Sequence, residues 1–347
     1  MSKEGFELSE IKWINFPDAK FVVNGLAWFA ENSPRLWRLP RRLKAKVRPE
    51  VWELAVMPSG GRIRFASDTT SLAIRASYTA LDKWHNMCKI GQAGIALYMD
   101  GRFWKPVWPE KTGRQELTFF KGAPRAMRDC TLYLPLGHAV ELLALGFDTK
   151  AKIKPPAPFA VERPVVFYGT SITQGGCASQ AGTSYQAILG RALNVDFINL
   201  GFSGEGRGEP ELAHAVAQID ASAFVLDFAQ NCPTVEELAA RYGPFIDTIR
   251  AARPDAPIIC ITPIFATRNL FSKDARARFD ELAAVIRRAA AARIAAGDRN
   301  IRCVEGLSLL SPADADGFVD GVHPNDLGFA REASVLGPIV ADALGLS

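Results

Sequence analysis

The stretch Pro164-Val165-Val166-Phe167-Tyr168-Gly169-Thr170-Ser171-Ile172-Thr173-Gln174-Gly175-Gly176 decides how the second half of the chain folds. Its first part, Val165–Tyr168, is apolar throughout, which is typical of a strand that is buried on both faces of a sheet. The polar residues after it predict a turn into a helix, where backbone N–H groups point outward. Ser171 is therefore expected at the strand end, within reach of a ligand. Helix capping, a common role of serine, is the alternative.

Apolar strands and helical stretches alternate through the rest of this half. Such alternation predicts a parallel sheet that helices cover on both faces, and ligands of these sheets bind beyond the carboxyl ends of the strands. The predicted strands are Val165–Tyr168, Asp196–Leu200, Phe224–Phe228, Ile258–Thr262 and Arg302–Val304. The predicted helices are Tyr185–Leu193, Pro210–Gln218, Val235–Ala251, Asp274–Ala296 and one that follows Pro324.

The first half of the chain has a different pattern. Short stretches alternate polar and apolar residues between turn signals such as Asp68-Thr69-Thr70, which is typical of an antiparallel β-sandwich. The prolines of Lys152-Ile153-Lys154-Pro155-Pro156-Ala157-Pro158 favour an extended linker, so we expect two domains, 1–157 and 158–347. The strands predicted in the first are Val51–Val56, Arg62–Phe65, Ser71–Ala76, Ile95–Met99, Gln115–Phe120, Thr131–Leu136 and Val140–Leu145.

Composition excludes some classes of protein. The 347 residues include 41 basic and 37 acidic ones, a net charge of +4, which gives no argument for a nucleic-acid partner. The basic run Arg35–Arg48 is more typical of a solvated surface than of a polyanion site. Residues 1–7 lack the apolar core of a signal peptide, and no apolar stretch is long enough to span a bilayer. We therefore expect a cytoplasmic protein that has no membrane partner.

The six cysteines are scattered and form no CxxC pair, so reduced thiols are expected in that compartment. Cys177 and Cys232 lie close in sequence to candidate site residues. For both, a small core residue is the favoured interpretation, and catalysis is the alternative.

Asp320-Gly321-Val322-His323-Pro324 supplies the groups that a serine nucleophile needs. A serine hydroxyl is a weak nucleophile unless a base takes its proton, and the base needs a third group to fix its tautomer. At this spacing Asp320 can accept from one ring nitrogen of His323 while the other nitrogen faces Ser171. A surface loop that only caps the next helix is the alternative.

Two further loops could stabilise an oxyanion. The glycine-rich Asn199–Gly208 lets the backbone approach a ligand and turn its N–H groups toward it, although a surface turn is equally compatible. Asn231 follows the strand Phe224–Phe228, and its amide can donate to an oxyanion or merely form a turn. Each of these structural alternatives, a helix cap, a turn or a surface loop, is reasonable alone. Together they explain poorly why four loops with complementary side chains should meet at one sheet edge.

Taken in chain order, the motifs in these four loops resemble those of the SGNH (GDSL-like) hydrolase superfamily, and the resemblance covers about residues 160–345. The resemblance implies a flavodoxin-like three-layer α/β/α domain with a parallel five-stranded sheet, and no metal or organic cofactor. It implies Ser171 as nucleophile, His323 as base, Asp320 as the orienting carboxylate, and an oxyanion hole made by Ser171, Gly204 and Asn231. The matching blocks are Gly169-Thr170-Ser171-Ile172, Gly201-Phe202-Ser203-Gly204, Ala229-Gln230-Asn231-Cys232 and Asp320-x-x-His323. Two blocks depart from the pattern: Thr170 replaces an aspartate, and Ala229-Gln230-Asn231-Cys232 replaces Gly-x-Asn-Asp.

Two other strings resemble a bacterial two-domain branch that carries an N-terminal, jelly-roll-like β-sandwich. They are Tyr168–Ser179 and Gly94-Ile95-Ala96-Leu97-Tyr98, in which Ala96 replaces the aspartate of a Gly-x-Asp-Leu-Tyr signature. The resemblance implies a serine esterase for short acyl groups, acetyl above all, on a carbohydrate or polyol. An acyltransferase that uses the same residues is the alternative. The expected partner is a small-molecule or oligosaccharide ester. The sequence leaves open whether the protein forms a homo-oligomer. Trp104 and Trp108 are expected either to stack on a sugar ring or, for at least one of them, to lie in the sandwich core.

Other functions explain less. An α/β-hydrolase elbow is broken because Thr173 stands where its last glycine is required, and the lysine of a P-loop is missing. A flavodoxin-like FMN site would leave Asp320, His323 and Asn231 without a role. An inactive scaffold would not need the complete Ser–His–Asp set.

Overall fold

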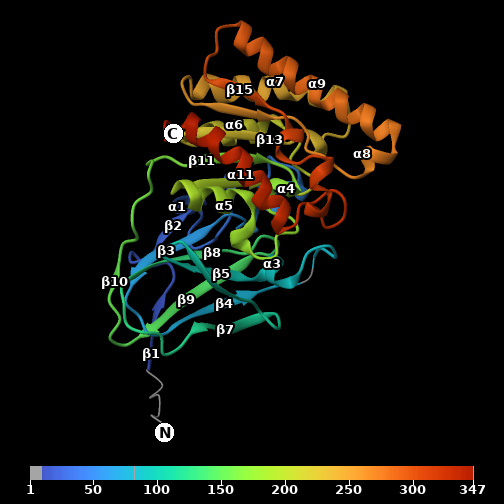
Figure 1. Ribbon diagram of the computed structural model, residues 1–347. Coiled ribbons are helices and arrows are strands. Elements are labelled where there is room, and N and C mark those ends of the chain that lie inside the picture. Colours follow the sequence, from blue (N-terminus) through green and yellow to red (C-terminus); the bar gives the residue numbers. More distant parts are fainter. Residues whose placement is uncertain (1–9, 82, 347) are drawn as a thin grey trace.

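The computed structural model describes residues 10–81 and 83–346, and Figure 1 shows a helix-flanked sheet above a β-rich part. Residues 1–7, on which the expectation of no export signal rests, lie outside the described residues. Within the part that the structure describes, none of the helices has both the length and the apolarity that crossing a bilayer requires.

The second half forms the predicted parallel sheet, in the order β12-β11-β13-β14-β15. Every residue of the three strands at one side of the sheet, β12, β11 and β13, is buried, which is why their sequences are mostly apolar, with Asn199 and Asp227 as polar exceptions. The observed bounds are close to the predicted ones: β11 Val165–Gly169, β12 Phe197–Gly201, β13 Ala223–Asp227, β14 Ile258–Ile261 and β15 Ile301–Val304.

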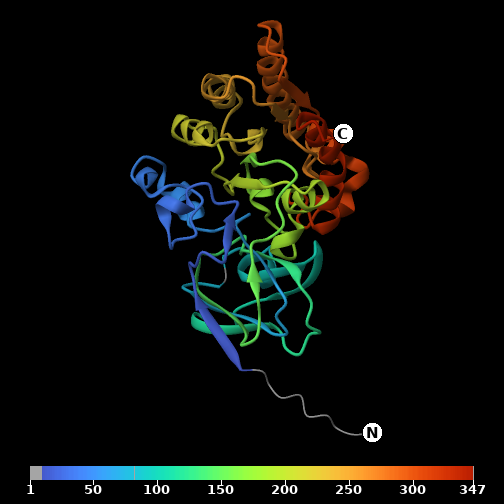
Figure 2. The ribbon, with the colours of Figure 1, turned by 90° about the vertical axis from the view of Figure 1, so that its left-hand side faces the viewer.

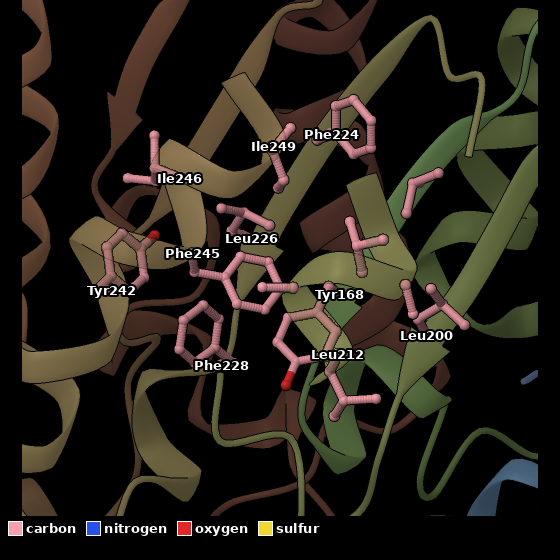
Figure 3. Packing of buried hydrophobic residues seen from close by; sticks show 14 of the residues in the cluster. Tyr168, Leu200, Leu212, Phe224, Leu226, Phe228, Tyr242, Phe245, Ile246 and Ile249 are labelled. Carbon is pink, nitrogen blue, oxygen red and sulfur yellow. The ribbon is translucent and has the colours of Figure 1, made fainter. Parts of the chain in front are cut away.

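Helices cover both faces of this sheet. One face packs on α6, α7 and α9, and the other packs on α5 and α11. Figure 3 shows the first core, where the rings of Tyr168 and Phe245 stack at 4.6 Å and those of Phe228 and Tyr242 at 4.9 Å. The helices are α4 Ser171–Gln174, α5 Tyr185–Leu193, α6 Pro210–Gln218, α7 Val235–Ala252, α8 Arg268–Phe271, α9 Lys273–Ala295, α10 Gly306–Leu309 and α11 Asp326–Ala343.

The first half is a sandwich of two antiparallel sheets. Their orders are β1-β9-β4-β7 and β10-β3-β8-β5-β6, with β2 beside β3, and the core between them includes Phe65, Ile74 and Leu132. The strands are β1 Ile11–Asn15, β2 Val22–Asn24, β3 Arg62–Ser67, β4 Leu72–Tyr78, β5 Ile95–Met99, β6 Arg102–Val107, β7 Gly113–Phe120, β8 Arg128–Tyr133, β9 Val140–Asp148 and β10 Ile153–Lys154. The short helices are α1 Phe29–Asn32, α2 Pro49–Ala55 and α3 Lys89–Ala93.

The strand predicted at Val51–Val56 is wrong, because this segment is the helix α2. Its apolar residues Val51, Trp52, Leu54 and Ala55 are buried at helical spacing, and Pro49 stands in the first turn, where its fixed φ favours a helix. A short apolar run cannot distinguish strand from helix by periodicity alone.

The segment that carries α2 packs against the parallel sheet rather than inside the sandwich. Trp52 and Leu54 share one core with Leu200 and Leu212, although they precede the proline-rich connection by about a hundred residues. Figure 2 shows this segment, in blue, beside the helices of the sheet. The packing therefore crosses the boundary after residue 157.

A buried arginine fixes the same contact. The guanidinium of Arg38, 1% exposed, donates to the backbone oxygens of Leu54 and Met57 at 2.8 Å, and to those of Asn199 and Gly201 at the end of β12. The guanidinium also lies over the ring of Phe202, 4.7 Å from its centroid, so the N-terminal segment holds the strand end from which the glycine-rich loop starts.

Candidate active site

Ser171 stands where β11 turns into α4. The hydroxyl of Thr170, the preceding residue, caps this helix by accepting from the N–H of Ile172 at 3.2 Å. Because Thr170 fills the capping role, the hydroxyl of Ser171 is free to face another partner. That partner is His323, whose Nε2 lies 2.8 Å from Oγ of Ser171.

His323 and Asp320 are brought together by the turn that they share. Oδ1 of Asp320 accepts the backbone N–H of Val322 at 3.0 Å and of His323 at 2.9 Å, while Oδ2 lies 2.8 Å from Nδ1 of the ring. Since the carboxylate accepts, Nδ1 carries the proton in the neutral ring, and Nε2 is left as an acceptor toward Ser171. Nε2 of His323 can therefore take the proton of the Ser171 hydroxyl.

Asp320 is held in its charged form. Burial alone would raise its pKa, but hydrogen bonds from the backbone of His323, the side chain of Asn86 and the ring of His323 outweigh burial and hold this pKa well below its usual range. A permanently ionised carboxylate next to the ring favours the imidazolium that forms when the ring takes a proton.

The other predicted residues line the same hollow as Ser171 and His323. It has a volume of about 300 Å³, and its wall includes Gly204 and Asn231. Gly204 has φ +74°, a conformation that favours glycine, and the amide of Asn231 donates to the backbone oxygen of Phe202 at 3.1 Å. The structure thus brings together all five residues that the sequence predicts.

The strand order explains why they meet. The chain runs from β11 outward to β12 on one side and to β13 on the other, so the loops after these strands diverge around a crevice at their carboxyl ends. Gly201 ends β12 directly beside α4, where an added Cβ would lie 2.1 Å from the backbone nitrogen of Gln174. Glycine is therefore required for the close approach of these two elements.

Ser171 and His323 also line a second, smaller hollow of about 60 Å³. Its wall includes the apolar side chains of Trp84, Met87 and Leu136, which all come from the first half of the chain. The sequence does not predict these residues or their neighbour Asn86, because nothing in their spacing connects them with residues 171 or 323.

Trp104 and Trp108, expected from the sequence to stack on a sugar ring or to lie in the sandwich core, are exposed residues outside the lining of the two hollows. Trp104 and Trp108 are 49% and 43% exposed, so neither lies in the sandwich core, and neither is among the residues that line the two hollows. Trp104 instead packs edge-on against Phe120. Their expected place in the core is therefore wrong.

Cys177 and Cys232 are buried, as predicted. Burial raises the pKa of each thiol to about 12, which makes both poor nucleophiles. Potential metal-ligand atoms of Cys177, Asp320 and His323 lie within 4.8 Å of one another, but here they are engaged in hydrogen bonds with each other and with Asn86.

Two family profiles match the chain. Residues 162–341 match the GDSL-like lipase/acylhydrolase family, and residues 11–153 match the GxDLY family, the N-terminus of SGNH hydrolase-type esterases. No curated protein matches the sequence.

Several solved structures share the fold over nearly the whole chain. A protein designated a GDSL-like lipase, from Bacteroides ovatus, is 28% identical, with a TM-score of 0.88 over 97% of this chain and 99% of its own. A salicylyl-acyltransferase from a tetracycline biosynthetic pathway is 19% identical, with a TM-score of 0.84 over 97% and 98%. An acetyl xylan esterase from the rumen bacterium Butyrivibrio proteoclasticus is 14% identical, with a TM-score of 0.66 over 97% and 100%.

A parallel sheet of this order behind a β-sandwich, together with these matches, defines a carboxylic ester hydrolase of the SGNH type. The chain belongs to the GDSL-like lipase/acylhydrolase family. Its residues 11–153 are the N-terminal region that accompanies such esterases.

Proposed function

We propose that the protein is a serine esterase in which Ser171 attacks the ester carbonyl. The observation that carries this proposal is the continuous chain of hydrogen bonds from Oγ of Ser171 through the ring of His323 to Asp320, with both distances at 2.8 Å. His323 takes the hydroxyl proton and returns it to the leaving alcohol, and Asp320 stabilises the imidazolium. Water then hydrolyses the acyl-enzyme by the same steps.

The oxyanion of the tetrahedral intermediate is received by the backbone N–H groups of Ser171 and Gly204 and by the amide of Asn231. The first N–H is at the start of α4, and Gly204 and Asn231 line the hollow that Ser171 faces. Donors fixed in this way stabilise charge that develops only in the transition state.

The two hollows suggest how the substrate lies. The small one is walled by Trp84, Met87 and Leu136 and suits a short acyl group, such as acetyl. The wide one also presents the polar side chains of Gln230 and Arg268, which suit a carbohydrate or polyol. The acetyl xylan esterase with the same fold supports this substrate class.

An acyltransferase is the second candidate, favoured by the salicylyl-acyltransferase that shares the fold. It would use the same residues and differ only in the acceptor of the acyl group. Product analysis with water alone, and then with added sugar alcohols, distinguishes the two.

We propose further that residues 1–157 form a domain that shapes the substrate site and that 158–347 form the catalytic domain. Support comes from the apolar wall that the sandwich contributes to the small hollow. We also propose a cytoplasmic location, which the six unpaired cysteines favour because disulfides are rare in that compartment.

A panel of esters tests the substrate assignment. Acetyl, butyryl and octanoyl esters of an aryl alcohol and of a sugar alcohol separate the two halves of the substrate. We expect kcat/KM to fall as the acyl chain grows and to be higher for the sugar ester. Equal rates for acetyl and octanoyl esters would contradict the short acyl site.

A further inference from the structure

The side chain of Asn86 reaches from the β-sandwich to the carboxylate of Asp320. Its Nδ2 lies 2.7 Å from Oδ2 of Asp320 and 3.4 Å from Nδ1 of His323. Because an ionised carboxylate can only accept, the amide presents its NH₂ group here. The other hydrogen bonds that Asp320 accepts come from Val322 and His323, which belong to its own turn. Among the described residues, Asn86 is thus the donor from outside that turn.

The turn that carries Asn86 is itself held in place. Gln92 in α3, 2% exposed, donates to the backbone oxygens of Trp84 at 2.8 Å and Met87 at 2.6 Å, and its own oxygen accepts the N–H of Trp84 at 3.0 Å. From the other side, the thiol of Cys177 donates to the backbone oxygen of Asn86 at 3.3 Å. The backbone of the turn is tied to both halves of the chain, so the point from which the side chain of Asn86 extends is fixed.

We propose that Asn86 is a positioning residue for the ester-cleaving reaction, acting on Asp320 so that the carboxylate keeps facing Nδ1 of His323. This inference rests on the proposed function, since it gives Asn86 a part in the relay that starts at Ser171. A carboxylate whose Oδ2 met a single donor could turn away from the ring. With Asn86 in place, Oδ2 lies between two donors and stays in line with His323. The β-sandwich then supplies part of the catalytic apparatus as well as a wall of the substrate site.

Two substitutions separate positioning from packing. Asn86→Ala removes the donor, and we expect kcat to fall about tenfold with KM changed less than about twofold, as for the loss of a hydrogen bond to a charged group. Asn86→Asp keeps the shape but places a second carboxyl group against Oδ2 of Asp320, which Nδ2 of Asn86 approaches to 2.7 Å, and two carboxylates this close share one proton. While the pair holds that proton, its O–H replaces the amide as donor to Asp320. The kcat of Asn86→Asp should therefore fall as rising pH removes the shared proton, a loss that the wild type does not show.

The charged and titratable groups near the ring of His323 should not change the pH dependence of activity in these variants. Among the described residues near His323, burial raises the pKa of the Cys177 thiol to about 12, so the thiol stays neutral through the assay range. The guanidinium of Arg268 lines the same hollow as the ring and is common to all the variants. His85→Ala is the matched control, because it alters the neighbouring exposed side chain of the same turn. We expect it to keep the kcat and the pH profile of the wild type, and thermal unfolding of each variant monitors folding.

The inference is overturned if Asn86→Ala keeps kcat within twofold of the wild type. It is also overturned if both Asn86 variants lose kcat by the same factor at every pH from about 5 to 8, because that result describes a purely structural residue. Ser171→Ala in the same series tests the proposed function separately. Wild-type activity that disappears in Ser171→Ala but survives in both Asn86 variants rejects the role of Asn86 alone.

Discussion

Oγ of Ser171 and Nε2 of His323 lie 2.8 Å apart although 152 residues separate them in sequence. The parallel sheet makes this possible, because it places the turn after its first strand and the loop before the last helix at one edge. Neither residue differs from an ordinary surface serine or histidine until the fold joins them.

Asn231→Ala should lower kcat about 10²–10³-fold and change KM much less, because an oxyanion donor acts mainly in the transition state. Steady-state kinetics on an aryl acetate measures both constants. Pro233→Ala is a suitable control, since it alters an exposed side chain two residues away that lines neither hollow. A change confined to KM would assign Asn231 to substrate binding instead.

The activity should fall on the acid side, because the ring of His323 must be neutral to take the hydroxyl proton of Ser171. Hydrogen bonds hold the pKa of Asp320 well below its usual range in spite of burial, so Asp320 stays ionised through this region. The acid limb of kcat/KM should therefore have the slope of one proton. A profile that is flat from about pH 5 to 8 contradicts a histidine base.

Two buried carboxyl groups beneath the site should make stability depend on pH. Burial raises the pKa of Asp227 to about 7 and that of Glu332 well above its usual range. Oδ1 of Asp227 and both carboxylate oxygens of Glu332 lack a hydrogen-bond partner among the described residues. An aspartate in the unfolded chain loses its proton near pH 3.9. Between that pH and about 7, Asp227 keeps its proton in the folded state but not in the unfolded state. The folding stability therefore declines as the pH rises through this range.

Asp227→Asn removes the part of this decline in stability that comes from Asp227, because an amide does not titrate. The variant should gain stability relative to the wild type as the pH is raised from 5 to 8, as measured by denaturant unfolding at both values. The exposed Asp255→Asn is the control and should show the same small difference at each pH. If Asp227→Asn behaves like this control, Asp227 is not protonated in the folded protein.

A chain that starts at Pro158 should be insoluble. It would lack Trp52 and Leu54, which pack in the core of the parallel sheet, and Arg38, which holds the end of β12. Co-expression with residues 10–157 should restore a soluble complex, and a sedimentation assay measures both outcomes. A soluble and fully active 158–347 would show that the N-terminal segment contributes little to folding or substrate binding.

Local patterns predict much of this structure, for physical reasons. The strands β11, β12 and β13 are buried on both faces, so their sequences are mostly apolar and stand out from the helices between them. Ser171, Gly204 and Asn231 each follow such a strand, and Asp320 lies three residues from His323, so short-range sequence already suggests their roles.

What the sequence does not predict depends on contacts between distant segments. Asn86 and Trp84 lie on a turn whose importance comes only from its place beside His323, and no periodicity marks that place. The helix α2 resembles a strand because its apolar run is short, and it is the parallel sheet that provides its packing partner. Trp104 and Trp108 are prominent in sequence, yet both are exposed away from the two hollows.

The most direct test of the account is to react the protein with a fluorophosphonate and to locate the adduct by mass spectrometry. Attack by Oγ of Ser171 forms a P–O bond and releases fluoride, while His323 takes the proton. We predict one phosphonylated residue, Ser171, with loss of esterase activity in proportion to labelling and no labelling of Ser171→Ala. An active wild type that is not labelled, or that carries the adduct on another residue, would contradict the assignment of Ser171 as the nucleophile.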